Sequence, residues 1–151
     1  MSWEAIGGMI TGVATAFAAV LVILQLRELN KQAKLAHFSD YTQRFNDIVV
    51  NFPEDVMSKD FLLAQRADRD QLMRYFRRYF DLCFEEWFLH RRGLIANDIW
   101  RMWESGIKAG MGHPSIQQAW LIVKATATFD PAFLAFIDGL IASDSAAAPR
   151  A

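Results

Sequence analysis

A continuous apolar stretch near the N-terminus constrains this chain more than any other feature of its sequence. From Ala5 to Leu26 it reads AIGGMITGVATAFAAVLVILQL, and its strongly polar member, Gln25, stands near the far end. At ~1.5 Å per residue, a helix of this length matches the ~30 Å hydrocarbon core of a bilayer. The stretch predicts one transmembrane helix, with residues 1–26 as the anchor of a single-pass membrane protein.

The residues that flank the apolar stretch predict its orientation. Trp3 precedes it, where an interfacial aromatic side chain belongs, and Arg27, Lys31 and Lys34 follow it. Basic residues that follow a membrane span are retained on its cytoplasmic side. The tryptophan and the three basic side chains also suit the lipid headgroup region. We therefore expect the N-terminus outside and the remainder of the chain on the cytoplasmic face of a bacterial inner membrane.

Two other interpretations of the stretch fit less well. A cleaved signal peptide needs a basic start and a short apolar core, and Ala14-Thr15-Ala16 could serve as its cleavage site. The start here carries Glu4 and no base, and the apolar residues continue to Leu26. A buried helix of a soluble protein rarely extends this far without a charge.

A strip of small residues follows one side of the predicted span. Its members are Gly8, Gly12, Thr15, Ala16 and Ala19, and the two glycines form a G-x-x-x-G pattern. Such a strip lets two helix backbones approach closely in lipid. The strip is either an interface with a second copy or another membrane subunit, or a chance result of the abundance of Gly and Ala in membrane helices.

The next segment, residues 27–52, predicts an amphipathic helical rod that continues the span without a break. It contains no Pro or Gly, and its apolar residues recur every three or four positions. Asn51 and Glu54 have the spacing of a capping box for a short following helix that ends near Arg66.

Residues 53–143 predict a compact bundle of about four to five helices, and the fold class is all-α. Asp68 with Gln71 opens a helix that is apolar over a wide arc and is therefore expected at the centre, and Gly93 ends it as a left-handed cap. Later helices begin at Asn97 or Asp98, at a capping box of Ser115 and Gln118, and at Pro131. Residues 144–151 are expected to form a flexible tail.

Composition supports one packed domain and restricts its partners. Of the 151 residues, 13% are aromatic, which argues against a disordered chain. No basic stripe free of acidic neighbours occurs, so we expect no nucleic-acid binding. Cys83 is the sole cysteine and lies between apolar neighbours, so it predicts a core residue in a reducing compartment.

The strongest candidate for a chemical site is the cluster of Glu85, Glu86 and His90. Two carboxylates and an imidazole on one helix can bind a metal or move protons. A di-iron centre, however, needs Glu-x-x-His from two helices, which this sequence lacks. The alternative is that both glutamates pair with nearby arginines, namely Arg77, Arg78, Arg91 or Arg92. No catalytic residue or cofactor is therefore expected.

Four segments resemble those of uncharacterised bacterial single-span membrane proteins that have a cytoplasmic helical domain of unknown function. These segments are QLRELNKQAK, FEEWFLHRRGLIANDIWRMWESGI, HPSIQQAW and FDPAFLAFIDGL, in that order. The resemblance implies the same architecture and implies no activity.

Together these features predict a non-enzymatic, membrane-anchored interaction module. It would be an accessory subunit of a larger membrane complex or a self-associating scaffold, and its partners would be the bilayer and other membrane subunits or a second copy. The alternative is a small tethered metal-binding enzyme or sensor that uses Glu85, Glu86 and His90.

Overall fold

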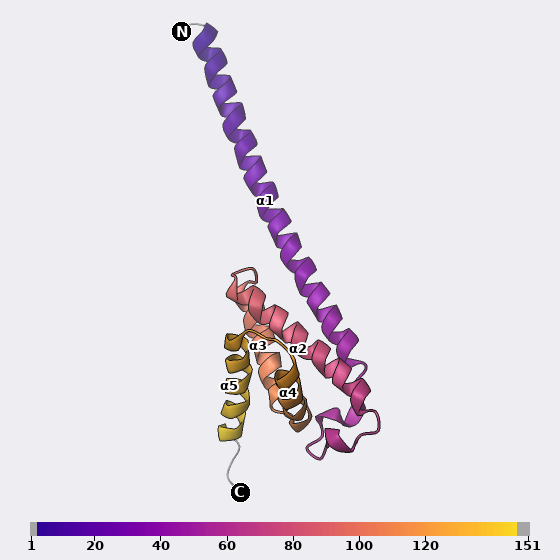
Figure 1. Cartoon of the computed structure of the whole chain (residues 1–151). Coiled ribbons are helices and arrows are strands. Elements are labelled where there is room, and N and C mark those ends of the chain that lie inside the picture. Colours follow the sequence, from indigo (N-terminus) through magenta and orange to yellow (C-terminus); the bar gives the residue numbers. More distant parts are fainter. Residues whose placement is uncertain (1–2, 148–151) are drawn as a thin grey trace. The chain divides into compact units, whose positions relative to one another are not determined.

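The chain folds into helices, and every regular element in residues 3–147 is helical, which confirms the all-α prediction. This computed structural model describes the backbone of those residues and the side chains of residues 20–32 and 36–144. Five α-helices and two 3-10 turns follow one another in the described chain (Figure 1): α1 Trp3–Val49, η1 Glu54–Met57, η2 Leu63–Gln65, α2 Arg69–Arg91, α3 Asn97–Met111, α4 Pro114–Thr126 and α5 Pro131–Ala147.

The chain divides into two units, Met1–Asp40 and Tyr41–Ala151, and α1 belongs partly to each. The helix runs through the boundary without a break, as the absence of Pro and Gly predicts. The boundary between the two units lies within residues 27–52, the segment predicted as a rod. From Tyr41 onward α1 belongs to the bundle unit because Tyr41 and Ile48 are buried in its core.

In the first unit, the described part of α1 begins with a run of exposed apolar side chains. Val20, Leu21, Val22, Ile23, Leu24, Leu26 and Leu29 are each 44–61% exposed. Five of these are consecutive, so they point in all directions around the helix axis.

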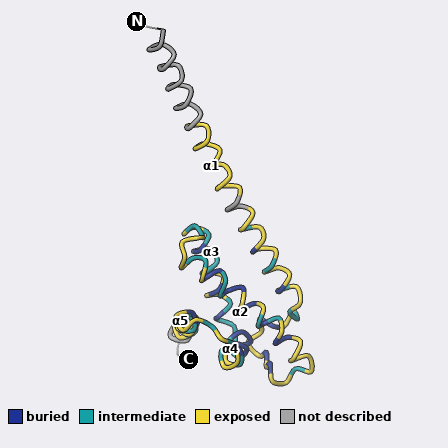
Figure 2. The backbone as a smooth tube through the Cα atoms, turned by 45° about the horizontal axis from the view of Figure 1, so that its top comes forward, coloured by how far each residue is buried: buried dark blue, intermediate teal, exposed yellow. Residues whose placement is uncertain are grey.

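The bundle unit is built around α2, as its wide apolar arc predicts. The helix contacts both α3 and α4, and buried positions recur along its length (Figure 2). At the centre, Phe80 lies 4.9 Å from the ring of Trp120, and Phe84 lies 5.2 Å from the ring of Phe133. Because Trp120 and Phe133 are fully buried, this aromatic cluster joins α4 and α5 to α2.

The segment between α1 and α2 differs from its prediction. The expected helix up to Arg66 is replaced by the turns η1 and η2. Asn51 does not begin a helix, because its side-chain amide donates to the backbone carbonyl of Asp47 (2.7 Å) at the end of α1. The segment is held instead by Gln118 of α4, which donates to the carbonyl of Phe61 and accepts from the amide of Leu63 (both 3.1 Å).

The capping predictions are correct in part. Gly93 has a positive φ of 69°, and the backbone amide of Leu94 donates to the carbonyl of Leu89, so the left-handed end of α2 is confirmed. Asp68 occupies the N-cap position of α2, but its carboxylate pairs with Arg66 rather than with the helix. The box of Ser115 and Gln118 is wrong, since α4 begins with Pro114 and Gln118 reaches the η2 segment.

The last helix begins at Pro131 as predicted and ends later than predicted. The carboxylate of Asp130 accepts a hydrogen bond from the amide of Ala132 (2.7 Å), which caps the first turn. The helix continues to Ala147, past the boundary expected at residue 144, and residues 148–151 lie outside the described residues.

Helices α2 and α3 meet closely at Gly110, where an added methyl group would lie 2.5 Å from the hydroxyl of Tyr79. Tyr79 is buried and cannot easily move aside. We expect Gly110→Ala to destabilise the bundle by ~1–3 kcal/mol through overpacking, less any gain in helix propensity. Gly106 lies on the same helix with open space around it, so Gly106→Ala should be neutral or stabilising by up to ~1 kcal/mol.

Urea unfolding of the two variants in the same detergent measures this difference. Equal free energies of unfolding for Gly110→Ala and Gly106→Ala would contradict the close approach of α2 to α3.

Candidate functional site

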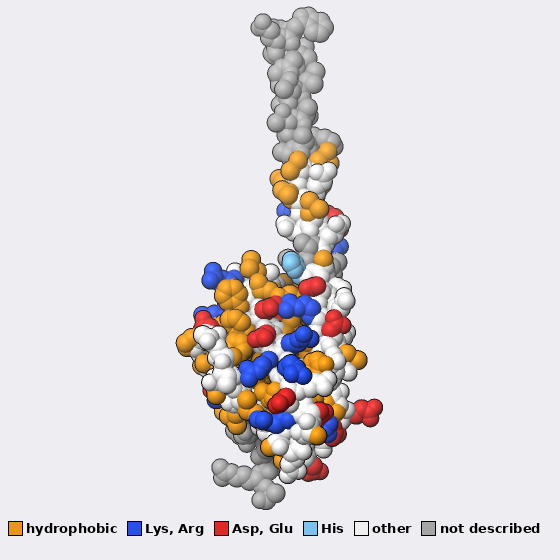
Figure 3. Space-filling view, turned by 45° about the vertical axis from the view of Figure 1, so that its right-hand side comes forward, with side chains coloured by type: hydrophobic (Ala, Val, Ile, Leu, Met, Phe, Trp, Pro, Cys, Tyr) orange, Lys and Arg blue, Asp and Glu red, His pale blue; other side chains and the backbone are white. Residues whose placement is uncertain are grey.

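The predicted cluster on α2 is divided between two environments. Glu85 faces the part of α1 that belongs to the bundle, where Arg44 binds it through two hydrogen bonds of 2.7 and 3.1 Å. The hydroxyl of Tyr41 donates to the same carboxylate at 3.4 Å, and the Arg44 guanidinium lies over the Tyr41 ring. Figure 3 shows basic and acidic side chains lying close together on one face of the bundle unit.

This geometry favours the charged form of Glu85. The hydrogen bonds from Arg44 lower the pKa of the Glu85 carboxyl, while its partial burial opposes that effect. A bidentate contact between a guanidinium and a carboxylate also fixes the relative orientation of the two side chains. Glu85 and Arg44 therefore join α1 to α2, and the carboxylate is engaged in a structural contact.

The next residue, Glu86, lies on the inner side of α2. It is 7% exposed and makes no hydrogen bond to any described residue. Burial raises the pKa of Glu86 to about 7, an effect that Arg44 opposes and the charge of Glu85 reinforces. The carboxyl group therefore titrates near neutral pH. Such a raised pKa is typical of an acid that is removed from water without a hydrogen bond or positive charge in contact with it.

The third member, His90, packs against α3. Its ring stacks on that of Trp100, with centroids 4.5 Å apart and planes 5° from parallel. Its Nδ1 atom is buried without a hydrogen-bond partner. Among the residues whose side chains are described, no group of three or more His, Cys, Asp or Glu is placed to hold a metal ion, and Glu85, Glu86 and His90 do not form one.

The arginine partners expected for the two glutamates are wrong. Arg77 donates to the hydroxyl of Thr126 (2.9 Å), while Arg91 and Arg92 lie over the rings of Trp87 and Phe88. Glu85 instead pairs with Arg44, which is 41 positions away in the sequence. A pair this far apart cannot be predicted from the spacing of residues along one helix. Cys83 is buried with a raised thiol pKa caused by burial, which confirms its prediction as a core residue.

The residues predicted to act at the membrane are described only in part. Arg27 and Lys31 are exposed on α1. The side chains of Trp3, Lys34 and the small-residue strip lie outside the described residues; the strip consists of Gly8, Gly12, Thr15, Ala16 and Ala19. Across the described residues, no helix combines the length and hydropathy needed to cross a membrane. Most of the predicted span, up to residue 19, lies outside the side chains that are described.

A feature that the sequence analysis missed is the connection between α2 and α3. It brings exposed apolar side chains and arginines together at one end of the bundle unit. The signal was present in the letters WFLHRRGLI, where three consecutive basic residues and a glycine stand between apolar residues. Compared with known proteins, the chain matches no family model, no curated protein and no solved structure.

Proposed function

We propose that this chain is a membrane-anchored helical interaction module. The observation that carries the proposal is the run from Ala5 to Leu26 within the single helix α1, in which Gln25 is the one strongly polar residue. Among its described residues, the consecutive apolar side chains from Val20 to Leu24 are exposed around the whole helix, and a bilayer would surround them with an apolar environment.

The proposed orientation has the N-terminus outside and the bundle in the cytoplasm of a bacterium. Arg27, Lys31 and Lys34 follow the apolar run, and Trp3 precedes it. A reporter that is active solely in the cytoplasm, fused to the C-terminus, should be active. If this fusion is silent and a second fusion, to a reporter active only outside the cytoplasm, is active, the orientation is the opposite of the one proposed.

Two observations favour an interaction module over the metal-binding alternative. Glu85 is engaged by Arg44, and His90 is packed against Trp100, so neither side chain is directed with Glu86 toward a common ion. The small-residue strip, in contrast, supplies a surface for a second helix in lipid. The module would act as an accessory subunit of a larger membrane complex or as a self-associating scaffold.

Purification from native membranes in mild detergent, followed by native sizing, tests this function. We expect an assembly larger than a monomer, and we expect Gly8→Ile or Gly12→Ile to shift it toward the monomer because Ile separates the helix backbones. Ala14→Ile is the matched control, since at ~100° per residue position 14 lies on the opposite side of the helix.

The partner found in the assembly decides between the two forms of the proposal. Other subunits in fixed proportion indicate an accessory role, and copies of this chain alone indicate a scaffold. A monomer whose size is unaffected by all three substitutions would overturn the interaction module.

A further inference from the structure

The turn between α2 and α3 carries an unusual combination of exposed side chains. We call the four residues Phe88, Arg91, Arg92 and Leu94 the α2–α3 tip. Leu94 is 68% exposed and Phe88 is 38% exposed. The Arg92 guanidinium lies 4.9 Å from the centre of the Phe88 ring, so apolar and basic groups form one continuous surface.

The backbone holds this surface in a fixed conformation. Gly93 takes a left-handed φ of 69°, its amide donates to the carbonyl of His90 (2.9 Å), and the amide of Leu94 donates to that of Leu89 (3.0 Å). These are the hydrogen bonds of a Schellman turn. Leu94 therefore stands at the apex of a turn that is already ordered. Binding through Leu94 needs no further loss of backbone conformational entropy.

The charge of the tip is positive. Between Phe88 and Arg101 the chain contains three arginines and one acidic residue, Asp98. Neither Arg91 nor Arg92 forms an ion pair with a described residue, and each lies over an aromatic ring. Such a surface, with apolar side chains between arginines, complements the anionic headgroups and shallow apolar layer of a lipid surface.

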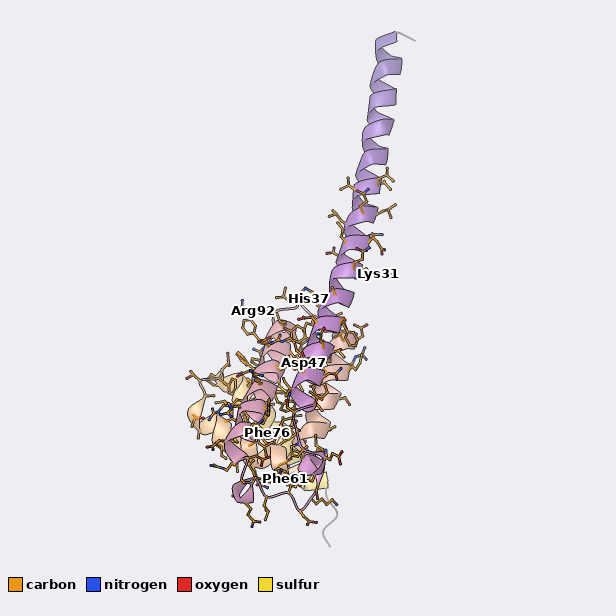
Figure 4. The ribbon with its side chains drawn as sticks, turned by 90° about the vertical axis from the view of Figure 1, so that its right-hand side faces the viewer. Lys31, His37, Asp47, Phe61, Phe76 and Arg92 are labelled. Carbon is orange, nitrogen blue, oxygen red and sulfur yellow. The ribbon has the colours of Figure 1, made fainter. Side chains whose placement is uncertain are left out.

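The tip lies at the end of the bundle unit where the chain enters from the N-terminal side. Within this unit α1 and α2 are antiparallel, because Tyr41 contacts Glu85 while Phe52 contacts Phe76. From Glu85, α2 continues to Arg91, which extends about 9 Å at ~1.5 Å per residue. Figure 4 places Arg92 and Phe61 at opposite ends of the unit.

The length of the connecting chain permits contact with the bilayer. Residues 27–40 separate the predicted span from the bundle unit, and as a helix they extend at most ~21 Å. The headgroup layer adds about 5–7 Å beyond the hydrocarbon core, and an arginine side chain extends further still.

We propose that the α2–α3 tip docks on the anionic surface of the same bilayer that holds the anchor. Leu94 and Phe88 would enter the headgroup layer, and Arg91 and Arg92 would bind lipid phosphates. This inference rests on the proposed membrane anchor and gives the bundle a second, charge-dependent contact with the membrane.

The test uses the full chain reconstituted in vesicles of phosphatidylcholine, with or without phosphatidylglycerol. A fluorophore is attached through Leu94→Cys, and the matched control is Leu62→Cys, which is 49% exposed at the opposite end of the unit. Buried Cys83 should not react in the folded protein. Quenching by lipids spin-labelled at the headgroup reports contact with the bilayer.

We expect the label at position 94 to be quenched in anionic vesicles and the label at position 62 to stay bright. Each of Arg91→Gln and Arg92→Gln should lower the ratio of docked to undocked protein by about fivefold, and ~1 M salt should abolish docking. Equal quenching at the two positions, or quenching at position 94 that is independent of anionic lipid and of both arginines, would overturn the proposal.

Flotation of the same samples separates this failure from failure of the anchor. If the chain floats with both kinds of vesicle but position 94 is not quenched, the anchor holds and the docking proposal is wrong. If the chain floats with neither kind, the proposed membrane function is itself wrong. Quenching that requires a second protein instead of anionic lipid would also reject docking on lipid.

Discussion

Glu86→Gln should stabilise the bundle by about 3 kcal/mol at pH 8 and by less than ~1 kcal/mol at pH 5. The Glu86 carboxyl is buried without a hydrogen bond, and burial raises its pKa from 4.5 to about 7. At ~1.36 kcal/mol per pKa unit, the charged form costs about 3 kcal/mol in the folded state. Glutamine has the shape of the protonated acid and cannot ionise.

The direction of the pH dependence follows from the difference in bound protons. Between pH 4.5 and about 7 the folded protein binds more protons at Glu86 than the unfolded chain does. Raising the pH through this range therefore lowers the free energy of unfolding, and the loss is complete above pH 7. Nearby Arg44 reduces the effect, and the charge of Glu85 increases it.

Urea unfolding across pH 5–8 measures this contribution as the difference between the variant and the natural sequence. All other ionisable groups are common to both proteins, so their contributions cancel in that difference. The matched control is Glu54→Gln, an exposed acid whose replacement should alter stability by less than ~0.5 kcal/mol at either pH. A difference that does not vary with pH would show that Glu86 is solvated or paired in the folded protein.

Trp120→Ala should destabilise the bundle by ~3–5 kcal/mol, which is a large share of the ~5–15 kcal/mol of an ordinary domain. Trp120 is fully buried, and its ring packs against Phe80 of α2 and Phe133 of α5. Its indole N–H also donates to the carboxylate of Asp138 (2.8 Å). Truncation removes the side chain that joins α4 to both neighbouring helices.

The neighbouring residue provides the control for this substitution. Leu121 is 61% exposed on the same helix, so Leu121→Ala should change stability by less than ~0.5 kcal/mol. If Trp120→Ala does not fold, Trp120→Phe keeps a buried ring, loses the hydrogen bond to Asp138 and should cost ~1–3 kcal/mol. Similar melting temperatures for the alanine variants of positions 120 and 121 would contradict the described core.

The helices could be predicted from the sequence because their signals are local. The spacing of apolar residues predicted helices whose ranges approximate those of α2, α3, α4 and α5. Gly93 and Pro131 marked the end of one helix and the start of another. The segment from Asn51 to Arg66 was predicted wrongly because Asn51 and Glu54 have the residue types and spacing of a capping box. In the structure, the distant side chain of Gln118 satisfies the backbone at Phe61 and Leu63 instead.

The candidate site could be located from the sequence, but its chemistry could not. Periodicity placed Glu85, Glu86 and His90 on α2 without indicating which element each would face. Glu85 meets Arg44, and Glu86 turns into the core, because the path of α1 across α2 is a tertiary feature. Adjacent residues on a helix differ by ~100° in direction, so two neighbouring carboxylates can differ this much in environment.

The membrane anchor is the central claim, and alkaline carbonate extraction of native membranes tests it most directly. This treatment releases proteins that are bound peripherally and leaves integral ones in the pellet. The control is the double substitution Ala16→Arg and Ala19→Arg, which adds ~2.5–3.5 kcal/mol of insertion cost per arginine near the middle of the span. We predict that the natural chain stays in the membrane pellet and that the double variant is released; complete release of the natural chain would contradict the anchor.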